Sequence, residues 1–200
     1  FLQGFRDMQE GFRYLRGHVD ASLGIIATGV QRGGLTALTL TALLLERNTF
    51  NDPAKPEDGL QGFGIALTIA GFGLFLGAFL APYGVARFGR HRWIKFAMLA
   101  SAFSPLILAV SQTEVGLCVT AFLTAFFGQN IKVTNDALVQ SKIDDYHRGR
   151  VFAVYDVVVN GAIVSGGLLA ALLLPTSGLS RAVPLAVSAA YFFFFQAEDG

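Results

Sequence analysis

The stretch FFGQNIKVTNDALVQSK, residues 126–142, places polar side chains inside a run of membrane-like sequence. Within twelve positions it carries six strongly polar side chains: Gln129, Asn130, Lys132, Asn135, Asp136 and Gln140. On a helix that turns 100° per residue, an arc of about 80° holds four of them: Gln129, Lys132, Asp136 and Gln140. Lys132 and Asp136 are four positions apart, so they are expected to pair. We interpret the stretch as a membrane-spanning helix with one wet face, and expect its opposite face, near Leu117, Phe122, Phe126 and Val133, to be apolar.

The composition of the whole chain favours a membrane protein. Hydrophobic residues make up 53% of the 200 residues and charged residues only 14%, whereas soluble domains average roughly 25% charged residues. The net charge of +1 gives no reason to expect a nucleic-acid partner. Cys118 is the single cysteine, so a disulfide within the chain is excluded.

Six apolar stretches are long enough, or nearly so, to cross a hydrocarbon core, which takes about 20 residues. They are residues 19–45, 63–86, 93–111, 115–140, 150–174 and 182–195. Their length and lack of two-residue alternation argue against a β-barrel, and their lack of polar faces argues against a soluble bundle. We therefore predict an all-α integral membrane protein. An amphipathic cytoplasmic linker over 1–17 would precede a six-helix half-domain over 18–193. We expect 194–200 to be a non-native read-through tail, since FQAEDG matches a translated sequencing adapter.

The basic residues between these stretches predict the topology through the positive-inside rule. With the N-terminus in the cytoplasm, the cytoplasmic segments hold ten basic residues: Arg6, Arg13, Arg16, Arg87, Arg90, Arg92, Lys95, Lys142, Arg148 and Arg150. The opposite segments hold three: Arg47, Lys55 and Arg181. We predict a multi-pass protein of the cytoplasmic membrane, with both ends of this chain in the cytoplasm.

Several motif-like features are better explained without catalytic or metal chemistry. The glycines of GFGLFLG, residues 71–77, lie in an apolar helix and follow no strand, so they are interpreted as helix-packing positions. The three histidines lack ligand spacing, and no H-E-x-x-H, C-x-x-C or G-x-S-x-G motif occurs. We expect no metal, no cofactor and no enzymatic activity.

Polar residues in the first, fourth and fifth stretches are the candidates for function, because a charge at mid-bilayer usually faces a partner or a watery cavity. We predict a substrate path lined by Arg32, Gln129, Lys132, Gln140 and Asn160. The proton-coupling or gate candidates are Asp136, Asp156, Arg148 and Arg150. Asp136 and Asp156 lie on stretches joined by a short loop, so they are expected at similar depth and in one shared site. The alternative is that these groups only form buried ion pairs.

Three segments, residues 7–18, 81–94 and 148–156, resemble parts of a major facilitator superfamily transporter. APYGVARFGRHRWI, residues 81–94, is similar to the loop motif G-x-x-x-D-R-x-G-R-R, with matching positions Arg87, Gly89, Arg90 and Arg92. Pro82 and Ala86 depart from the motif: Pro82 stands where the first glycine belongs, and Ala86 where the acidic residue does. DMQEGFRYLRGH, residues 7–18, resembles the linker between the two halves, and RGRVFAVYD, residues 148–156, resembles a later inner loop.

The resemblance implies the C-terminal six-helix half of a twelve-helix secondary transporter that works by alternating access. It also implies that the first, second, fourth and fifth helices face a central cavity. The expected partners are a small-molecule substrate, the N-terminal six-helix half and the lipid bilayer. The expected function is transport of a small solute, with proton-coupled efflux as one form. Two alternatives remain: an intramembrane enzyme and a non-transporting membrane scaffold.

Overall fold

The computed structural model describes residues 2–197, and the six predicted stretches all form helices. The elements are α1 (Leu2–Arg16), α2 (Val19–Leu45), α3 (Pro56–Phe88), α4 (Arg90–Val110), α5 (Glu114–Lys142), α6 (Asp145–Leu173) and α7 (Ala182–Ala197), with a short π-helical segment, η1 (Glu46–Phe50), after α2. The largest boundary difference is at α3, which was expected to begin at residue 63. Pro56 suits the first turn of a helix, and Glu57 and Asp58 complement its dipole, so α3 begins earlier.

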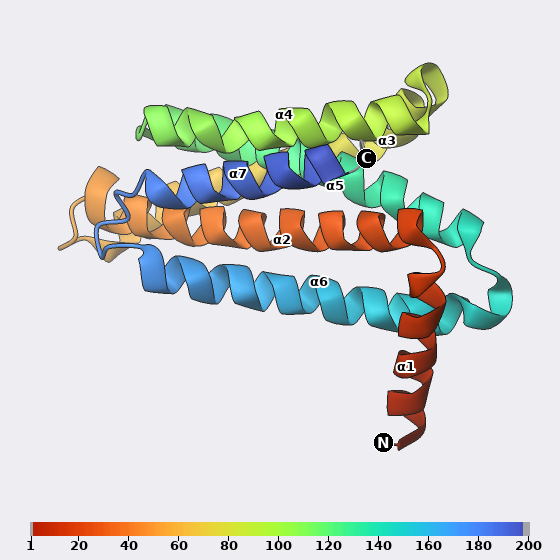
Figure 1. The fold of residues 1–200 in the computed structure, drawn as a ribbon. Helices are drawn as coiled ribbons and strands as arrows, with labels where there is room; N and C mark the ends of the chain where they lie inside the picture. Colours follow the sequence, from red (N-terminus) through yellow and green to blue (C-terminus); the bar gives the residue numbers. More distant parts are fainter. Residues whose placement is uncertain (1, 198–200) are drawn as a thin grey trace.

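Helices α2–α7 run alongside one another, whereas α1 lies across them at one end of the bundle (Figure 1). In this view α4, α7, α2 and α6 form a front layer from top to bottom, with α3 and α5 behind it. The most extensive contacts are between α3 and α5 and between α2 and α6. Candidate transmembrane helices in the described residues are α3, α4, α5 and α6, by length and hydropathy. Helix α7 is shorter, and Gln31 and Arg32 lower the hydropathy of α2.

Small residues permit the two closest helix pairs. A Cβ atom added to Gly73 of α3 would lie 2.6 Å from the backbone oxygen of Phe122 on α5, and one added to Gly77 would collide with that of Phe126. On α2, a Cβ at Gly33 would lie 2.7 Å from the backbone oxygen of Ala162 on α6. Small residues spaced along a membrane helix allow this approach of backbones. The interpretation of the glycines in residues 71–77 as packing positions is confirmed for Gly73 and Gly77 but is wrong for Gly71, which is exposed and whose added Cβ would meet nothing within 4 Å.

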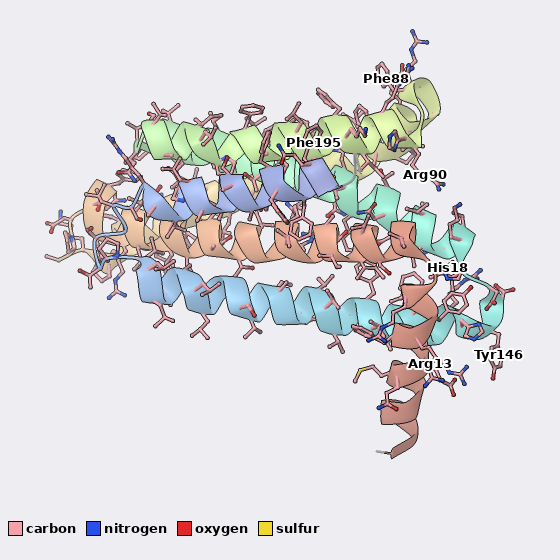
Figure 2. The ribbon with its side chains drawn as sticks, in the orientation of Figure 1. Arg13, His18, Phe88, Arg90, Tyr146 and Phe195 are labelled. Atoms are coloured by element: carbon pink, nitrogen blue, oxygen red, sulfur yellow. The ribbon has the colours of Figure 1, made fainter. Side chains whose placement is uncertain are left out.

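The loops meet in the two groups that the charge pattern predicted. Arg90 Nη1 donates to Ser141 Oγ at 3.5 Å, which links the start of α4 to the end of α5. At the other end, Asn48 Nδ2 donates to the backbone oxygen of Thr176 at 2.5 Å. Arg90, His18 and Tyr146 lie at one end of the bundle in Figure 2, the arginine-rich end, and the loop after α2 lies at the opposite end.

Candidate functional site

Arg32 and Gln129 meet near the middle of the bundle. Arg32 Nη2 on α2 donates a hydrogen bond of 2.7 Å to Gln129 Oε1 on α5, and both side chains are partly exposed. The two residues are 97 positions apart in the chain. The structure therefore brings together two residues that the sequence assigned to one substrate path.

Lys132, Asp136 and Tyr155 form the second part of the site. Lys132 Nζ lies 2.5 Å from Asp136 Oδ2, as the four-residue spacing predicted. Tyr155 on α6 donates from its hydroxyl to Asp136 Oδ1 at 2.6 Å, and Lys132 Nζ lies 5.9 Å from the centre of its ring. Both carboxylate oxygens are thus engaged. We call Arg32, Gln129, Lys132, Asp136 and Tyr155 the central polar cluster.

Tyr155 was missed by the sequence analysis, and it takes the place expected for Asp156. Successive helical residues point about 100° apart, so a helix that turns Tyr155 toward α5 turns Asp156 away. Asp156 is exposed, and its carboxylate makes no hydrogen bond or ion pair with Asp136 among the described residues. The predicted shared site of two carboxylates does not form in this structure.

The other path and gate candidates lie apart from the cluster. Asn160 is exposed and donates to the backbone oxygen of Asp156, one turn earlier on α6, at 2.8 Å. Gln140 is exposed near the arginine-rich end, and its backbone oxygen accepts a hydrogen bond of 3.4 Å from Arg148. The two arginines form ion pairs with other partners: Arg148 with Asp145 at 2.6 Å and Arg150 with Glu10 at 3.3 Å.

Helix α6 begins with a side-chain cap that makes its first turn sensitive to pH. Asp144 Oδ1 accepts hydrogen bonds from the backbone N–H of His147 at 2.9 Å and from its ring Nδ1 at 2.8 Å. These bonds, the backbone one first, lower the pKa of Asp144 below its ordinary value of 3.8. A lowered carboxyl pKa contributes stability above the ordinary value, and that contribution is lost as the pH falls through the lowered one.

We expect Asp144→Ala to open the first turn of α6, because the cap is lost. The amides of residues 145–148 should exchange faster with deuterium at neutral pH, measured by mass spectrometry. The difference from the unsubstituted protein should shrink as the pH falls below the ordinary carboxyl pKa of 3.8 and reaches the lowered pKa of Asp144, where the carboxyl protonates. Asp52→Ala, an exposed change at the opposite end, is the control. A difference that stays constant down to that pH would contradict the capping role.

The face of α5 opposite the cluster is polar and buried, which corrects the expectation of an apolar face. Asn135 is 1% exposed, and its Nδ2 donates to the backbone oxygen of Gly24 at 3.0 Å and to Thr28 Oγ1 at 3.1 Å. Gln31 Nε2 donates to the backbone oxygen of Thr124 at 3.2 Å. These bonds hold α5 against α2. The sequence had marked these residues only as polar.

Phe122 and Phe126 were also placed on the wrong face of α5. Phe122, Phe126 and Gln129 are spaced three and four positions apart, so their side chains leave the same side of α5. The rings of Phe122 and Phe126 stack with centroids 6.0 Å apart and planes 9° apart, and both side chains are partly exposed. An aromatic surface therefore borders the central polar cluster.

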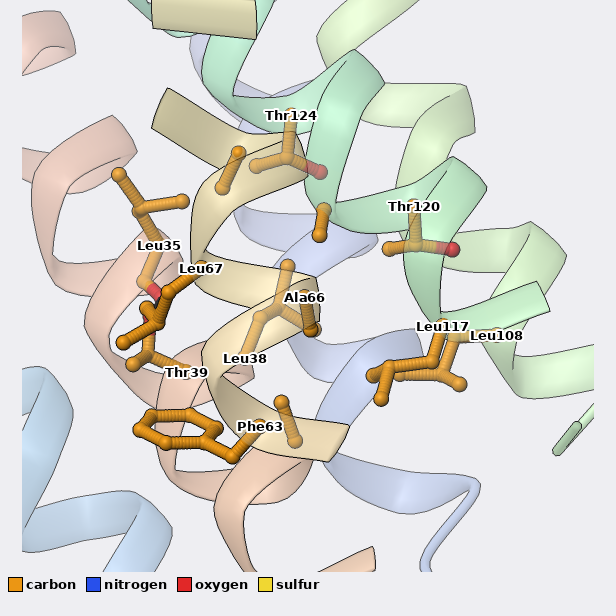
Figure 3. Close-up of a pocket in the computed structure, with 13 residues that line it drawn as sticks. Leu35, Leu38, Thr39, Phe63, Ala66, Leu67, Leu108, Leu117, Thr120 and Thr124 are labelled. Atoms are coloured by element: carbon orange, nitrogen blue, oxygen red, sulfur yellow. Dashed lines mark hydrogen bonds between the residues drawn. The ribbon is translucent and has the colours of Figure 1, made fainter. Parts of the chain in front are cut away.

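Figure 3 shows an apolar pocket between α2, α3, α4 and α5, beginning one turn along α2 from Arg32. Its lining includes Leu35, Thr39, Phe63 and Leu117, and its volume is about 30 Å³. Ligand pockets usually measure about 300–1,000 Å³. The pocket is too small for a solute in this conformation, so it does not by itself define a binding site.

The loop motif makes a tight connection between α3 and α4. Gly89 has φ of 81° and ψ of 149°, a backbone conformation open almost only to glycine. Arg87 and Arg92 flank it and are exposed, while Arg90 reaches Ser141. Within the described residues, no group of three or more His, Cys, Asp or Glu side chains is placed to hold a metal ion.

Comparison with known proteins identifies the family. The family model of the Major Facilitator Superfamily matches residues 21–197, which cover all six long helices. The chain belongs to the major facilitator superfamily. Two curated relatives, each called an uncharacterized MFS-type transporter, come from Mycobacterium bovis and Mycobacterium tuberculosis. Each is 31% identical over 153 residues, which cover 76% of this chain but only 34% of the relative. No solved structure gives a significant match.

Membership of the major facilitator superfamily confirms the predicted class of membrane helical bundle. The chain spans about a third of the length of the curated relatives it matches.

Proposed function

We propose that this chain forms one half of a secondary active transporter, which moves a small solute across the cytoplasmic membrane by alternating access. The observation that carries the proposal is the central polar cluster. Arg32 lies at the middle of α2 and Lys132 near the middle of α5, with its partner Asp136 one turn closer to the arginine-rich end, and all three side chains are partly exposed. Charged groups at that depth usually face a substrate or an ion pathway. The second half would cover the cluster and complete the site.

The arginine-rich end is proposed to face the cytoplasm. Loops and helix ends there carry ten of the fifteen basic residues, counting α1. Short loops rich in Lys and Arg remain on the cytoplasmic side during insertion. In this orientation Gln140, Arg148 and Arg150 lie on the cytoplasmic route to the cluster. Proton-coupled efflux is a further proposal, with Asp136 and Asp156 as the carboxylates that would carry the proton.

The two rival functions are less well supported by the arrangement. A non-transporting scaffold would have a sealed and fully paired polar interior, whereas Arg32, Lys132 and Asp136 are partly open. An intramembrane enzyme would need a nucleophile beside a base. In the part of the chain that the structure describes, no hydrogen bond joins a histidine ring to the side chain of a serine, threonine or cysteine.

Cysteine labelling tests alternating access without knowledge of the substrate. In the full-length protein without other cysteines, we expect Gln129→Cys to react with a membrane-impermeant maleimide applied from either face of sealed vesicles. A transporter exposes its central site to each side in turn, and the vesicles should still retain a trapped dye. Ala125→Cys, fully buried on the same helix, should react from neither face. Labelling of Gln129→Cys from one face alone would contradict the proposal.

A further inference from the structure

Arg32 is the cation of the central polar cluster that has no ion pair with a described carboxylate. Its one hydrogen bond goes to the neutral amide of Gln129, and no described carboxylate forms an ion pair with it. Lys132 differs, because Asp136 pairs with it directly. Arg32, Lys132 and Asp136 together therefore carry one excess positive charge. Asp156 is exposed on α6 and pairs with neither cation.

Asp136 has little capacity left for Arg32. Lys132 occupies its Oδ2 at 2.5 Å and the Tyr155 hydroxyl occupies its Oδ1 at 2.6 Å. Moving the carboxylate toward Arg32 would break one of these two bonds. The arrangement thus keeps Asp136 with Lys132 and leaves the partly exposed Arg32 without an ion pair to a described carboxylate.

Gln129 provides a second donor beside the guanidinium. An arginine has donors only, so the amide oxygen of Gln129 must be the atom that faces Arg32. Its Nε2 then points elsewhere and makes no hydrogen bond to another described residue. The guanidinium of Arg32 and the amide N–H₂ of Gln129 belong to hydrogen-bonded neighbours, and both are donors of the kind that binds the oxygens of a carboxylate or phosphate, for which arginine has the best geometry.

The surface next to these donors is aromatic. Phe126 precedes Gln129 by three positions on the same side of α5, and it stacks on Phe122. Phe72 of α3 lies 6.4 Å from the Phe122 ring, between centroids. An apolar or aromatic body attached to an oxyanion would extend along this surface.

We infer that the site takes an organic anion, with its oxyanion held by Arg32 and Gln129 and its apolar body against Phe122 and Phe126. The inference rests on the proposed transport function and narrows its substrate class. A substrate oxyanion would supply the negative charge that the cluster lacks. It would also explain why an arginine is tolerated in the middle of α2.

Thermal unfolding of the full-length protein in detergent tests this with matched pairs of probes. The pairs are benzoate with benzamide and octanoate with octanamide, and inorganic phosphate serves as an oxyanion without an apolar body. We expect at least one organic acid to raise the unfolding temperature at concentrations where its amide and phosphate do not. Equal stabilisation by the amides, stabilisation by phosphate as strong as by the acids, or no stabilisation by either acid would overturn the inference.

Substitutions then locate the site. Arg32→Gln should raise the half-maximal concentration of the stabilising acid at least about tenfold, since a charge-assisted contact is lost. Arg32→Lys should retain part of the effect, because the charge remains without the planar fork. Gln129→Leu provides a second variant if Arg32→Gln fails to fold. It should also raise the half-maximal concentration of the stabilising acid, because one donor to the oxyanion is lost. Arg13→Gln, an exposed change on α1, is the control with the same loss of charge. Unchanged binding of the acid in both Arg32→Gln and Gln129→Leu would place it elsewhere.

This outcome is separable from that of the labelling experiment. If Gln129→Cys reacts from both faces but neither acid stabilises the protein, alternating access is supported and the organic-anion substrate is contradicted. One-sided reaction with Arg32-dependent stabilisation by an acid would instead describe a binding protein that does not transport.

Discussion

Gly77→Leu should prevent stable folding of the full-length transporter. A single added carbon at position 77 collides with the backbone oxygen of Phe126 and lies 3.1 Å from Gln129 Cβ. Backbone cannot rotate out of the way as a side chain can, so relief requires α3 and α5 to separate. These two helices share the most extensive contact in the bundle. We expect the free energy of unfolding to fall by about 3 kcal/mol or more, the upper range for overpacking.

Titration with sodium dodecyl sulfate, followed by circular dichroism, measures the loss. Gly71→Leu is the matched control, because it makes the same change on the same helix where a Cβ meets nothing within 4 Å. Gly77→Ala should fall between the two, since its Cβ collides but carries no further atoms. Equal losses for Gly77→Leu and Gly71→Leu would show that the α3–α5 contact is not the cause.

The helices and the topology could be predicted because they depend on properties of continuous segments. A run of apolar residues long enough to cross the bilayer forms a helix there. Loops rich in Lys and Arg alternate along the chain with loops that have few, and this alternation indicates which helix ends lie on the same side. Local chemistry explains the one large boundary difference. Pro56 with Glu57 and Asp58 begins α3 before the apolar stretch does, and a hydropathy scan does not register a helix start of that kind.

The candidate site was only partly predictable, because it depends on how each helix is rotated against its neighbours. The pairing of Lys132 and Asp136 follows from their spacing on one helix. Their partner on α6, Tyr155, does not follow from any spacing within one helix. The sequence analysis expected the charged Asp156 in its place. On α5 a helical wheel cannot tell an asparagine that faces a cavity from one, such as Asn135, that bonds to another backbone inside the bundle. Which of two polar faces of α5 is open depends on how α2, α3 and α4 pack against that helix.

Asp136→Asn should lower the transport rate by about 100-fold while the protein still inserts and folds. Asp136 is the acceptor for both Lys132 and Tyr155, and the neutral amide weakens both charge-assisted hydrogen bonds, each worth about 1.5–3 kcal/mol. The side chains of Lys132 and Asp136 are 35% and 26% exposed, so the lower end of that range applies. A combined loss of about 3 kcal/mol corresponds to roughly 100-fold. Uptake of the stabilising acid into proteoliposomes is the measurement.

Two further variants separate pairing from proton transfer. Exchanging the charges, with Lys132→Asp and Asp136→Lys together, restores an ion pair at the same spacing but moves the carboxylate away from Tyr155. If the pair is only structural, the exchange should recover most of the transport rate. If Asp136 carries the coupled proton, the exchange stays inactive and Asp136→Asn loses the pH dependence of its residual rate. Asp156→Asn tests the other proposed proton carrier, whose side chain is exposed on α6 and forms no ion pair with Lys132 among the described residues. A flattened pH profile of transport in Asp156→Asn alone would show that the proton is carried by α6 and not by α5. Unchanged pH profiles in both Asp136→Asn and Asp156→Asn would show that neither carboxylate carries it.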